Sequence, residues 1–330
     1  MILAAGLGTR LRPITYRMPK PMVPVLNRPV MEHIVRLLAG QGFSEAIANL
    51  HWFPDLIRDH FGDGSRFGLE LSYSYEEHLL GTSGGVRKVA DFLGDSFLII
   101  SGDALTDIDL AAMREVHESH AGIATLATKR VQDTSQFGVA ITGSDGRIQG
   151  FQEKPDPAEA LSDLANCGIY MFRSEVFDFF PGPGASKAAG NGDPEGFADW
   201  AMDVFPRLLE ADVPFYSHEI EAYWNDIGNL DELRESTVDA LTGAVAVERE
   251  GETCDGFRSG TAAADEGELK GPVLIGPGAE IADDVRIDGP AVIGDGARVG
   301  AGSRLKEVIV LPGAELPAAS LAVGGIFGPA

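Results

Sequence analysis

The sequence has only two cysteines, and it lacks any long apolar run. Cys167 and Cys254 fit no metal-ligand or disulfide spacing, so we expect reduced thiols in a cytoplasmic protein. No stretch approaches the ~20 apolar residues that a transmembrane helix requires. The first residues also lack the basic start and the length of a signal peptide. We therefore expect a soluble, cytoplasmic chain with no membrane partner.

Positive charge is scarce as well, because 26 Lys and Arg stand against 50 Asp and Glu, a formal net charge of −24. The phosphates of nucleic acid or of an anionic membrane would repel most of such a surface. Acids in turn are missing before Glu32, and that stretch holds five basic residues: Arg10, Arg12, Arg17, Lys20 and Arg28. A basic cluster in an acidic protein predicts a site for a small, discrete anion.

The order of apolar segments predicts an α/β fold. The runs 1–6, 45–50 and 96–103 predict buried strands, the last ending at Gly102-Asp103, and the helical spacing over 28–42 predicts a helix between the first two. Strands that alternate with helices indicate a mostly parallel, Rossmann-like sheet. Ligands bind at the carboxyl ends of the strands in such sheets. The glycine turn at residue 6 and Asp103 both follow an apolar run, so both should reach that edge.

The C-terminal part has a different pattern. A polar linker over 241–270 precedes a six-residue period that contains Ile275, Ile281, Ile287, Ile293, Val299, Leu305 and Leu311. This period is typical of a parallel β-helix. We predict an α/β domain over 1–240 and a short left-handed parallel β-helix of about two coils over 271–330. The exposed end of that β-helix favours a homo-oligomer, most simply a dimer.

The basic cluster lies beside the turn Gly6-Leu7-Gly8. This turn begins like a dinucleotide fingerprint, but Leu11 replaces the third glycine and Pro13 interferes with the expected helix, which argues against NAD. Glycines also let backbone N–H groups approach a phosphate chain. The fork of Arg10 and the compact charge of Lys20 suit phosphate oxygens. The alternative is a set of solvated surface charges.

The stretch LAAGLGTRLRPITYRMPKPM (3–22) resembles the signature of the sugar nucleotidyltransferases, or nucleoside-diphosphate-sugar pyrophosphorylases. These enzymes join a nucleoside triphosphate to a sugar 1-phosphate and release pyrophosphate. Matching motifs follow in order, namely EEHLLGTSGG, IISGDALTDIDL, FGV, FQEKP, NCGIYMF and YWNDIGNLDEL. The resemblance covers nearly the whole chain and is strongest to the mannose-1-phosphate guanylyltransferase branch. It implies that the domain over 1–240 is a nucleotidyltransferase domain.

The resemblance also implies a set of site residues. The nucleotide would be bound by Leu3, Ala5, Gly6, Gly8, Thr9, Arg10, Gly81 and Thr82, with Glu76 or Glu77 beside the base. The sugar phosphate would be bound by Gly138, Glu153, Lys154 and Asn166. Asp103 and Asp226 would hold Mg²⁺. Lys20 would neutralise the α-phosphoryl group and the departing pyrophosphate, so the catalytic set is Arg10, Lys20, Asp103 and Asp226.

The chemistry favours the same residue types. Nucleotidyl transfer depends on positioning and charge stabilisation. Two carboxylates suit Mg²⁺, because this cation keeps waters and substrate oxygens at its other positions. The sugar phosphate is already an anionic nucleophile, so no general base is required. We therefore expect none of the seven histidines to be catalytic.

Two substrate pairs fit the predicted reaction. A carboxylate at Glu76 or Glu77 would accept hydrogen bonds from N1–H and N2–H₂ of guanine, which favours GTP with mannose 1-phosphate. UTP or dTTP with glucose 1-phosphate is the alternative. Cys167 and the glycine- and proline-rich segment 181–196 depart from the family pattern. We expect both near the sugar, where they would leave room for a carbocyclic analogue such as a valienol phosphate.

Two other functions compete with nucleotidyl transfer. An acyltransferase β-helix usually needs a basic histidine, and this chain has none after His218. A catalytically silent subunit that senses sugar nucleotides is the second alternative. The presence of Arg10, Lys20 and Asp103 argues against it.

Overall fold

The computed structural model describes residues 1–182, 184–190, 194–249, 251–254, 257–259 and 268–329. The chain divides into two compact units that alternate along the sequence. Unit 1 contains residues 1–7, 34–104 and 108–226, and unit 2 contains residues 8–33, 105–107 and 227–330. None of the described helices is long and apolar enough to cross a lipid bilayer.

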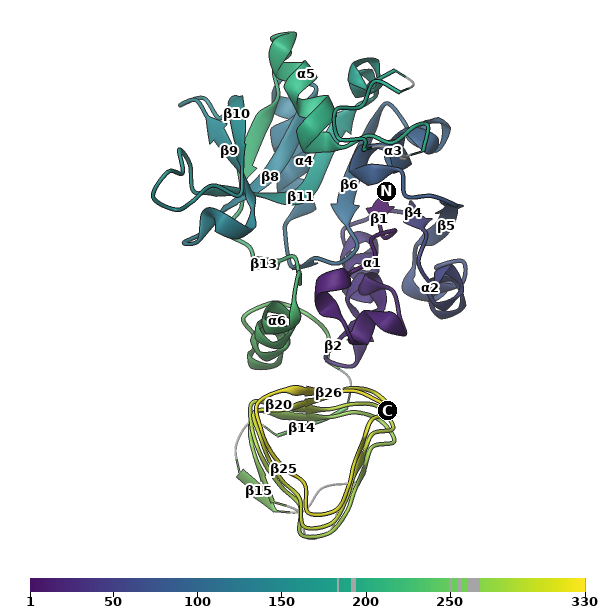
Figure 1. Cartoon of the computed structure of the whole chain (residues 1–330), viewed down its shortest axis with the longest axis vertical. Helices are drawn as coiled ribbons and strands as arrows, with labels where there is room; N and C mark the ends of the chain where they lie inside the picture. Colours follow the sequence, from purple (N-terminus) through teal and green to yellow (C-terminus); the bar gives the residue numbers. More distant parts are fainter. Residues whose placement is uncertain (183, 191–193, 250, 255–256, 260–267, 330) are drawn as a thin grey trace. The chain divides into compact units, whose positions relative to one another are not determined.

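Unit 1 is built on a nine-stranded sheet whose central part is parallel (Figure 1). Strand β1 (Ile2–Leu3) lies between β4 (Glu45–Leu50) and β6 (Ser96–Ser101) and is parallel to both, while β5 (Glu70–Tyr75) continues the sheet beyond β4. The chain thus starts in the middle, extends to one side and then crosses to the other. This order creates a switch point between β1 and β6, where α/β sheets bind ligands. The strands alternate with α1 (Val30–Gly40), α2 (Pro54–Phe61) and α3 (Gly81–Lys88).

The other part of this sheet is largely antiparallel. Strand β11 (Leu164–Arg173) pairs antiparallel with β6, β8 (Ala124–Arg130) and β9 (Gly138–Thr142). Strand β10 (Ile148–Glu153) forms a hairpin with β9, and β12 (Tyr216–Glu219) lies parallel to β8. Short connections favour antiparallel neighbours, because a parallel pair needs a long crossover. The predicted Rossmann-like α/β fold is confirmed, with this antiparallel extension added to its parallel core.

Aromatic rings hold the extension of unit 1 together. Trp200, in the π-helical turn η8 (Trp200–Val204), stacks on Phe172 of β11 with ring centroids 4.5 Å apart. Trp200 also stacks on Phe205 at the start of α5 (Phe205–Glu210), and Phe205 stacks on Phe215. All four rings are buried. Each aromatic pair contributes roughly 0.5–1.5 kcal/mol beyond its area burial, so η8 and α5 are fixed firmly to the sheet.

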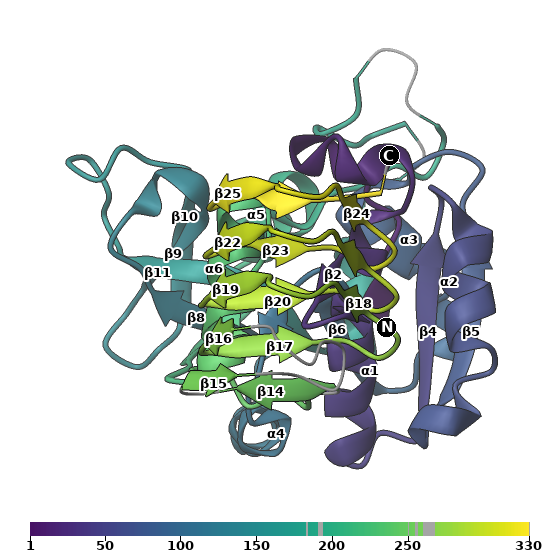
Figure 2. The ribbon, with the colours of Figure 1, turned by 90° about the horizontal axis from the view of Figure 1, so that it is seen from below.

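Unit 2 contains the predicted parallel β-helix, seen as stacked coils in Figures 1 and 2. Its strands form three ladders. The first contains β16 (Glu268–Lys270), β19 (Arg286–Asp288), β22 (Arg304–Lys306) and β25 (Leu321–Val323). The second contains β17 (Val273–Ile275), β20 (Ala291–Ile293), β23 (Ile309–Val310) and β26 (Ile326–Phe327). The third contains β18 (Glu280–Ile281), β21 (Arg298–Val299) and β24 (Glu315–Leu316).

These ladders make three complete coils and part of a fourth, so the prediction of about two coils is too low. The prediction counted only the residues of the apolar period, whereas β16 and the strands after residue 311 add further sides. The exposed last coil carries Leu321 and Val323, which are 81% and 79% exposed.

One corner of the β-helix is a residue shorter than those before it. Ile275 stacks on Ile293, 18 positions later, but Ile293 stacks on Val310, 17 positions later. The six-residue period extends to Leu311, whereas the residue stacked on Ile293 is Val310, one position earlier. The N–H of Gly294 donates to Val310, so Leu311 aligns with Gly294 instead. The shortening follows β22, where Glu307 alone replaces the Gly-Pro pairs of the earlier corners.

Part of the segment expected to be a linker is folded. Strands β14 (Glu252–Cys254) and β15 (Phe257–Ser259) pair antiparallel with β17 and β16. Residues 260–267 of the same segment lie outside the described residues. Before it, α6 (Leu230–Thr242) begins with a capping box between Asn229 and Glu232. The domain boundaries at residues 240 and 270 stay a prediction.

A histidine pair in unit 1, the buried His117 and the partly buried His120, links the end of α4 (Leu110–Ser119) to β8. His117 Nδ1 and His120 Nε2 each lie 2.9 Å from Thr125 Oγ1. The guanidinium of Arg173 donates to the carbonyl oxygens of both histidines. Burial, with smaller contributions from Arg173 and His120, lowers the pKa of His117 to about 4. His117 is therefore neutral in the folded protein near pH 7.

This pKa predicts a loss of stability in acid. The unfolded chain protonates His117 near pH 6.5 while the folded protein resists protonation down to about pH 4. The unfolded state therefore gains protons first, and stability falls as pH drops through this window. Between pH 7 and pH 5 we expect this residue to account for about 2 kcal/mol of the decrease in unfolding free energy. Urea unfolding of His117→Gln should show a correspondingly smaller decrease.

The exposed His78 provides the control. His78→Gln should keep the pH dependence of the unmodified protein. If His117→Gln keeps it too, the buried histidine is not the source of the acid sensitivity.

Candidate active site

Unit 1 brings several predicted residues to the switch point of its sheet. The N–H of Gly102, directly before Asp103, donates to the carbonyl of Leu3 at 2.9 Å. The carboxyl end of β6 therefore lies against the end of β1, from which Ala5 and Gly6 continue. Gly168 of β11 approaches Ser101, so the antiparallel strand reaches the same edge. Asp103 directly follows the end of β6 and is half-buried.

Glu76 has a different position from the one expected of a base ligand. It is 1% exposed, and its two carboxylate oxygens accept hydrogen bonds from Asn49 Nδ2 at 2.8 Å and from the N–H of Leu80 at 3.0 Å. Asn49 Oδ1 in turn accepts from the N–H of Ala4 at 2.7 Å. Each oxygen of Glu76 thus already accepts one hydrogen bond inside the protein, and its role beside the base stays a prediction. Among the two candidates only Glu77 is exposed.

The Ala4–Asn49–Glu76–Leu80 network links two parts of the predicted nucleotide site. It connects the segment after β1 to the residue that precedes α3, which carries Gly81 and Thr82. Sequence reasoning missed Asn49, since an asparagine inside an apolar strand carries no motif. Its burial at 3% exposure beside a buried acid is the signal that only the structure supplies.

Close packing against Ala198 and a positive φ explain why position 81 is a glycine. Its φ is +75°, and a Cβ there would lie 2.3 Å from the carbonyl oxygen of Ala198. The same carbonyl accepts from the N–H groups of Ser83 and Gly84, and Thr82 Oγ1 donates to Asp199. The start of α3 is thus packed against the segment that follows residue 196.

The segment 181–196 is tied to α3, on the side of the predicted base site. Arg87 of α3 donates to the carbonyl oxygens of Pro181 and Gly196, at 2.6 and 3.0 Å, and so joins the two ends of the segment. Ser186 Oγ and the N–H of Lys187 donate to the buried Asp203. The prediction that this segment lies near the sugar is therefore wrong. Its glycine and proline content suggested a loop but gave no information on its location.

Three of the predicted sugar residues lie on adjacent strands. Gly138 of β9 pairs with Glu153 of β10, and a Cβ on this glycine would lie 3.0 Å from Glu153 Oε2. β9 in turn pairs with β11 beside Asn166. Lys154 follows with φ +46°, and its N–H donates to Phe137. Its Nζ lies 3.4 Å from Glu153 Oε1 on the surface.

Asp226 follows β13 (Trp224–Asn225) at the end of unit 1. The indole N–H of Trp224 donates to the carbonyl oxygen of Cys167 at 2.9 Å, which joins β13 to β11 next to Asn166. Burial raises the pKa of the Cys167 thiol, and the charge of Asp226 adds to this shift. Cys167 is thus a buried neutral thiol close to Asp226 and beside a predicted sugar residue.

Unit 2 carries the basic part of the predicted site. Gly8 has φ +60° and precedes the 3₁₀ turn η1 (Thr9–Leu11). A Cβ on Gly8 would lie 2.8 Å from Cβ of Lys20, which begins η3 (Lys20–Met22). Thr15 Oγ1 donates to the carbonyl oxygen of Gly8 at 2.7 Å. The turn, Thr9 and Lys20 therefore form one packed loop, with short 3₁₀ turns where a dinucleotide fold would have a helix.

Arg10 belongs to the same loop and lies against the start of α6. A Cβ on Gly228 would lie 3.0 Å from one of its guanidinium nitrogens, and Gly228 donates to Glu232 of the capping box. Arg10 is exposed and Lys20 is half-buried. Two cations beside a left-handed glycine turn form a surface suited to phosphate oxygens.

The comparisons with known proteins agree with this geometry. A family model described as "Nucleotidyl transferase" matches residues 1–243. The chain belongs to this nucleotidyl transferase family. The match runs through the glycine turn, the β1–β6 edge and the antiparallel extension.

Relatives in this family differ in their nucleotide. A UTP–glucose-1-phosphate uridylyltransferase from Synechocystis sp. is 37% identical over 84% of this chain and 73% of its own length. A mannose-1-phosphate guanylyltransferase from Mycobacterium tuberculosis is 34% identical over 96% of this chain and 81% of its own. A solved structure of a putative glucose-1-phosphate thymidylyltransferase from Bacillus anthracis has a TM-score of 0.64 at 25% identity, covering 75% and 96% of the two chains. These proteins share the reaction class, but their names differ in the nucleotide and in the sugar.

The hydrogen bonds of Asn49 lead to a stability prediction for this nucleotidyl transferase. Asn49→Ala removes partners from the buried Ala4 N–H and from the buried Glu76 carboxylate, so we expect a loss of about 2–4 kcal/mol in unfolding free energy. Chemical denaturation measures this loss. The exposed Gln149→Ala should change the free energy by less than about 0.5 kcal/mol.

A second variant tests whether the two side chains act as a pair. Adding Glu76→Gln to Asn49→Ala should cost clearly less than the sum of the single changes, because both remove the same contact. Additive losses would contradict the network.

Proposed function

We propose that this chain transfers a nucleotidyl group from a nucleoside triphosphate to a sugar 1-phosphate. The observation that carries the proposal is the β1–β6 switch point, where Asp103 lies at the sheet edge expected to bind the ligand. The two cations of the glycine loop, Arg10 and Lys20, and the membership of the family support it. The relatives named above act on sugar 1-phosphates.

In this proposal the residues of the loop bind the triphosphate. Gly6, Gly8 and Thr9 offer backbone N–H groups to phosphate oxygens, together with the backbone at Leu3 and Ala5. Arg10 grips the β- and γ-phosphates with its fork, and Lys20 lies toward the α-phosphoryl group. Gly81 and Thr82 border the nucleoside.

Asp103 and Asp226 are the residues proposed to hold Mg²⁺. No group of three side chains of the metal-binding types gathers among the described residues. Two carboxylates nevertheless fit Mg²⁺, which prefers oxygen ligands and completes its shell with water and phosphate oxygens. When bound, the ion neutralises charge on the α-phosphoryl group and on the leaving pyrophosphate. The hydrogen bond between Gly102 and Leu3 fixes the backbone directly before Asp103.

The reaction forms one bond and breaks one. An anionic oxygen of the sugar 1-phosphate attacks the α-phosphorus in line, and the bond from the α-phosphorus to the bridging oxygen breaks. Pyrophosphate leaves with that electron pair, and the charge that develops on it faces Arg10 and Lys20. No proton has to be removed from the nucleophile, so no histidine is assigned.

The sugar phosphate is proposed to lie over β9, β10 and β11. Glu153 accepts hydrogen bonds from sugar hydroxyls, and the amide of Asn166 can accept and donate. The backbone at Gly138 adds a further contact, and Lys154 pairs with the phosphate. The buried Cys167 beside Asn166 departs from the family pattern. It leaves a mannose, a glucose or a carbocyclic analogue as possible acceptors.

GTP with mannose 1-phosphate is the pair that we propose first. Glu77 is exposed and precedes Gly81 by four positions, and a carboxylate there would accept from both guanine donors. The guanylyltransferase relative also matches 96% of this chain. UTP or dTTP with glucose 1-phosphate is the second candidate, favoured by the 37% identity with the uridylyltransferase.

The remaining predictions concern the protein in the cell. A cytoplasmic location and the absence of nucleic-acid partners are still inferred from composition and charge. A homo-oligomer, most simply a dimer, stays a prediction that the exposed apolar side chains of the last coil support.

Asp103→Asn should lower nucleotidyl transfer by at least about 100-fold, because the variant loses a charge proposed to hold Mg²⁺. Release of pyrophosphate from Mg²⁺, nucleoside triphosphate and sugar 1-phosphate measures the rate. Asp288→Asn, an exposed change on the β-helix, is the matched control and should turn over normally. Normal turnover by Asp103→Asn would refute the metal assignment. An unmodified protein that binds nucleotide but makes no product would favour the sensing subunit.

The base assignment is tested by the product. Incubation with each of five nucleoside triphosphates and a panel of sugar 1-phosphates, followed by mass spectrometry, should give a GDP-sugar. Glu77→Gln should then reduce the preference for GTP over UTP by about tenfold, since the neutral amide accepts one guanine hydrogen bond less well. A UDP- or dTDP-sugar, or an unchanged preference in Glu77→Gln, would overturn the guanine assignment and leave the reaction class intact.

A further inference from the structure

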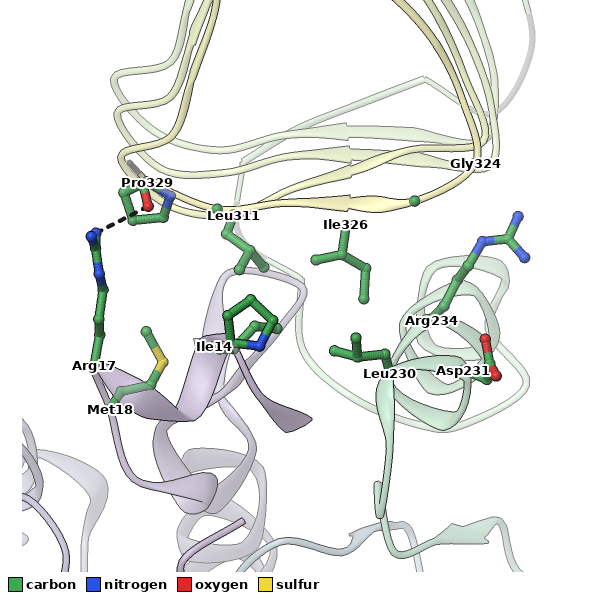
Figure 3. A pocket seen from close by; sticks show the side chains of 13 residues that line it. Ile14, Arg17, Met18, Leu230, Asp231, Arg234, Leu311, Gly324, Ile326 and Pro329 are labelled. Carbon is green, nitrogen blue, oxygen red and sulfur yellow. Dashed lines mark hydrogen bonds between the residues drawn. The ribbon is translucent and has the colours of Figure 1, made fainter. Parts of the chain in front are cut away.

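Unit 2 contains a cavity of about 650 Å³ that the proposed reaction does not use. Its walls come from three segments: residues 13–18 between η1 and η3, the first turn of α6, and the last coils of the β-helix. Figure 3 shows Ile326 and Leu311 facing Leu230 and Ile14 across it. The volume lies in the range of small-molecule sites.

The shortened corner of the β-helix supplies one of these walls. Leu311 takes the position at which the preceding coil has Gly294, so it places an isobutyl group where that coil has none. It is 4% exposed and lines the cavity. Together with Ile14, Leu230 and Ile326, Leu311 makes the middle of the cavity apolar.

Charged groups stand at both ends of the apolar interior. Arg17 lies at one end, where its guanidinium donates to the carbonyl oxygen of Pro329 at 3.0 Å (Figure 3). Arg234 of α6 lies at the other end, with Asp231 below it. One nitrogen of Arg234 is 3.4 Å from Glu307, whereas its buried Nε has no hydrogen-bond partner among the described residues. The Arg234 side chain is 40% exposed, and a charged guanidinium at the rim of an apolar cavity suits an anionic ligand.

The cavity wall is continuous with the triphosphate loop. Thr15, between the lining residues Ile14 and Arg17, donates to the carbonyl oxygen of Gly8 at 2.7 Å. Gly8 in turn lies against Lys20, which follows the lining residue Met18 by two positions. A ligand that displaced residues 13–18 would therefore shift the turn and the lysine together.

We infer that this cavity binds a small amphipathic anion, an apolar ring system that carries a phosphate, sulfonate or carboxylate. The rings occupy the space among Ile14, Leu230, Leu311 and Ile326, and the anionic group accepts from Arg234. Occupancy changes the affinity of the loop for the nucleotide, a coupling that rests on the proposed function. By linkage, the nucleotide changes the affinity of the cavity by the same factor.

The probe is 8-anilinonaphthalene-1-sulfonate, whose fused rings and sulfonate have this chemistry. Its fluorescence should report one saturable site on the full chain. Arg234→Gln should weaken binding about tenfold, and Ile326→Phe, which fills the interior, should abolish the site. Arg298→Gln is the matched control, because Arg298 also pairs with glutamates in unit 2 but lies away from the cavity. It should bind as the unmodified protein does.

A second measurement tests the coupling. Saturating probe should change the KM for the nucleoside triphosphate at least twofold in the unmodified protein and leave it unchanged in Arg234→Gln. Equal probe affinity in all three variants would overturn the site. If nucleotide displaces the probe one for one, and Arg234→Gln does not alter this displacement, the probe binds in the active site. That result would also overturn the proposed site. If the protein has no transfer activity, the fluorescence measurements still test whether the cavity binds the probe.

Discussion

The parallel alignment of β1 with β4 and β6 is the constraint on which unit 1 depends. Strand β1 has only two residues, and backbone pairing on both of its edges fixes its position. Ile2 pairs at once with Ala48 and Ile100, so three carboxyl ends terminate together. The residues that directly follow these three strand ends therefore lie at one edge of the sheet. The proximity of Asp103, Ala5 and Asn49 follows from register and needs no long side chain.

Residues that act through their position at the end of a strand could be predicted from the sequence. Asp103 follows an apolar run, and the hydrophobic pattern alone places it at the edge where the structure has it. Gly8 and Lys20 lie within a short stretch of sequence, and both residue types suit phosphate binding, so the sequence predicts that they belong to one site. The packing of Lys20 against Gly8 agrees with that grouping. Local patterns work where the relevant distance is short along the chain.

Other features depend on contacts between distant segments, and there the sequence was insufficient. Two adjacent glutamates, Glu76 and Glu77, look equivalent in the sequence, yet only one meets Asn49, 27 positions away. The segment 181–196 is anchored by Arg87 and Asp203, and its composition says nothing of either partner. In the β-helix, the six-residue period remained convincing up to Leu305. The loss of a single residue after it changed which side chain faces the core.

That shortened corner has a consequence for how such proteins diversify. A coil is held by ladders on three sides, so a one-residue deletion at a corner leaves the hydrogen bonds of the flat sides intact. It nevertheless shifts every later residue by one position in the repeat. A residue that would have filled the interior of the coil then lies at the next position along it. Length changes at corners are thus a form of variation separate from substitution. They present a new side chain to the outside while the inside keeps its stacking.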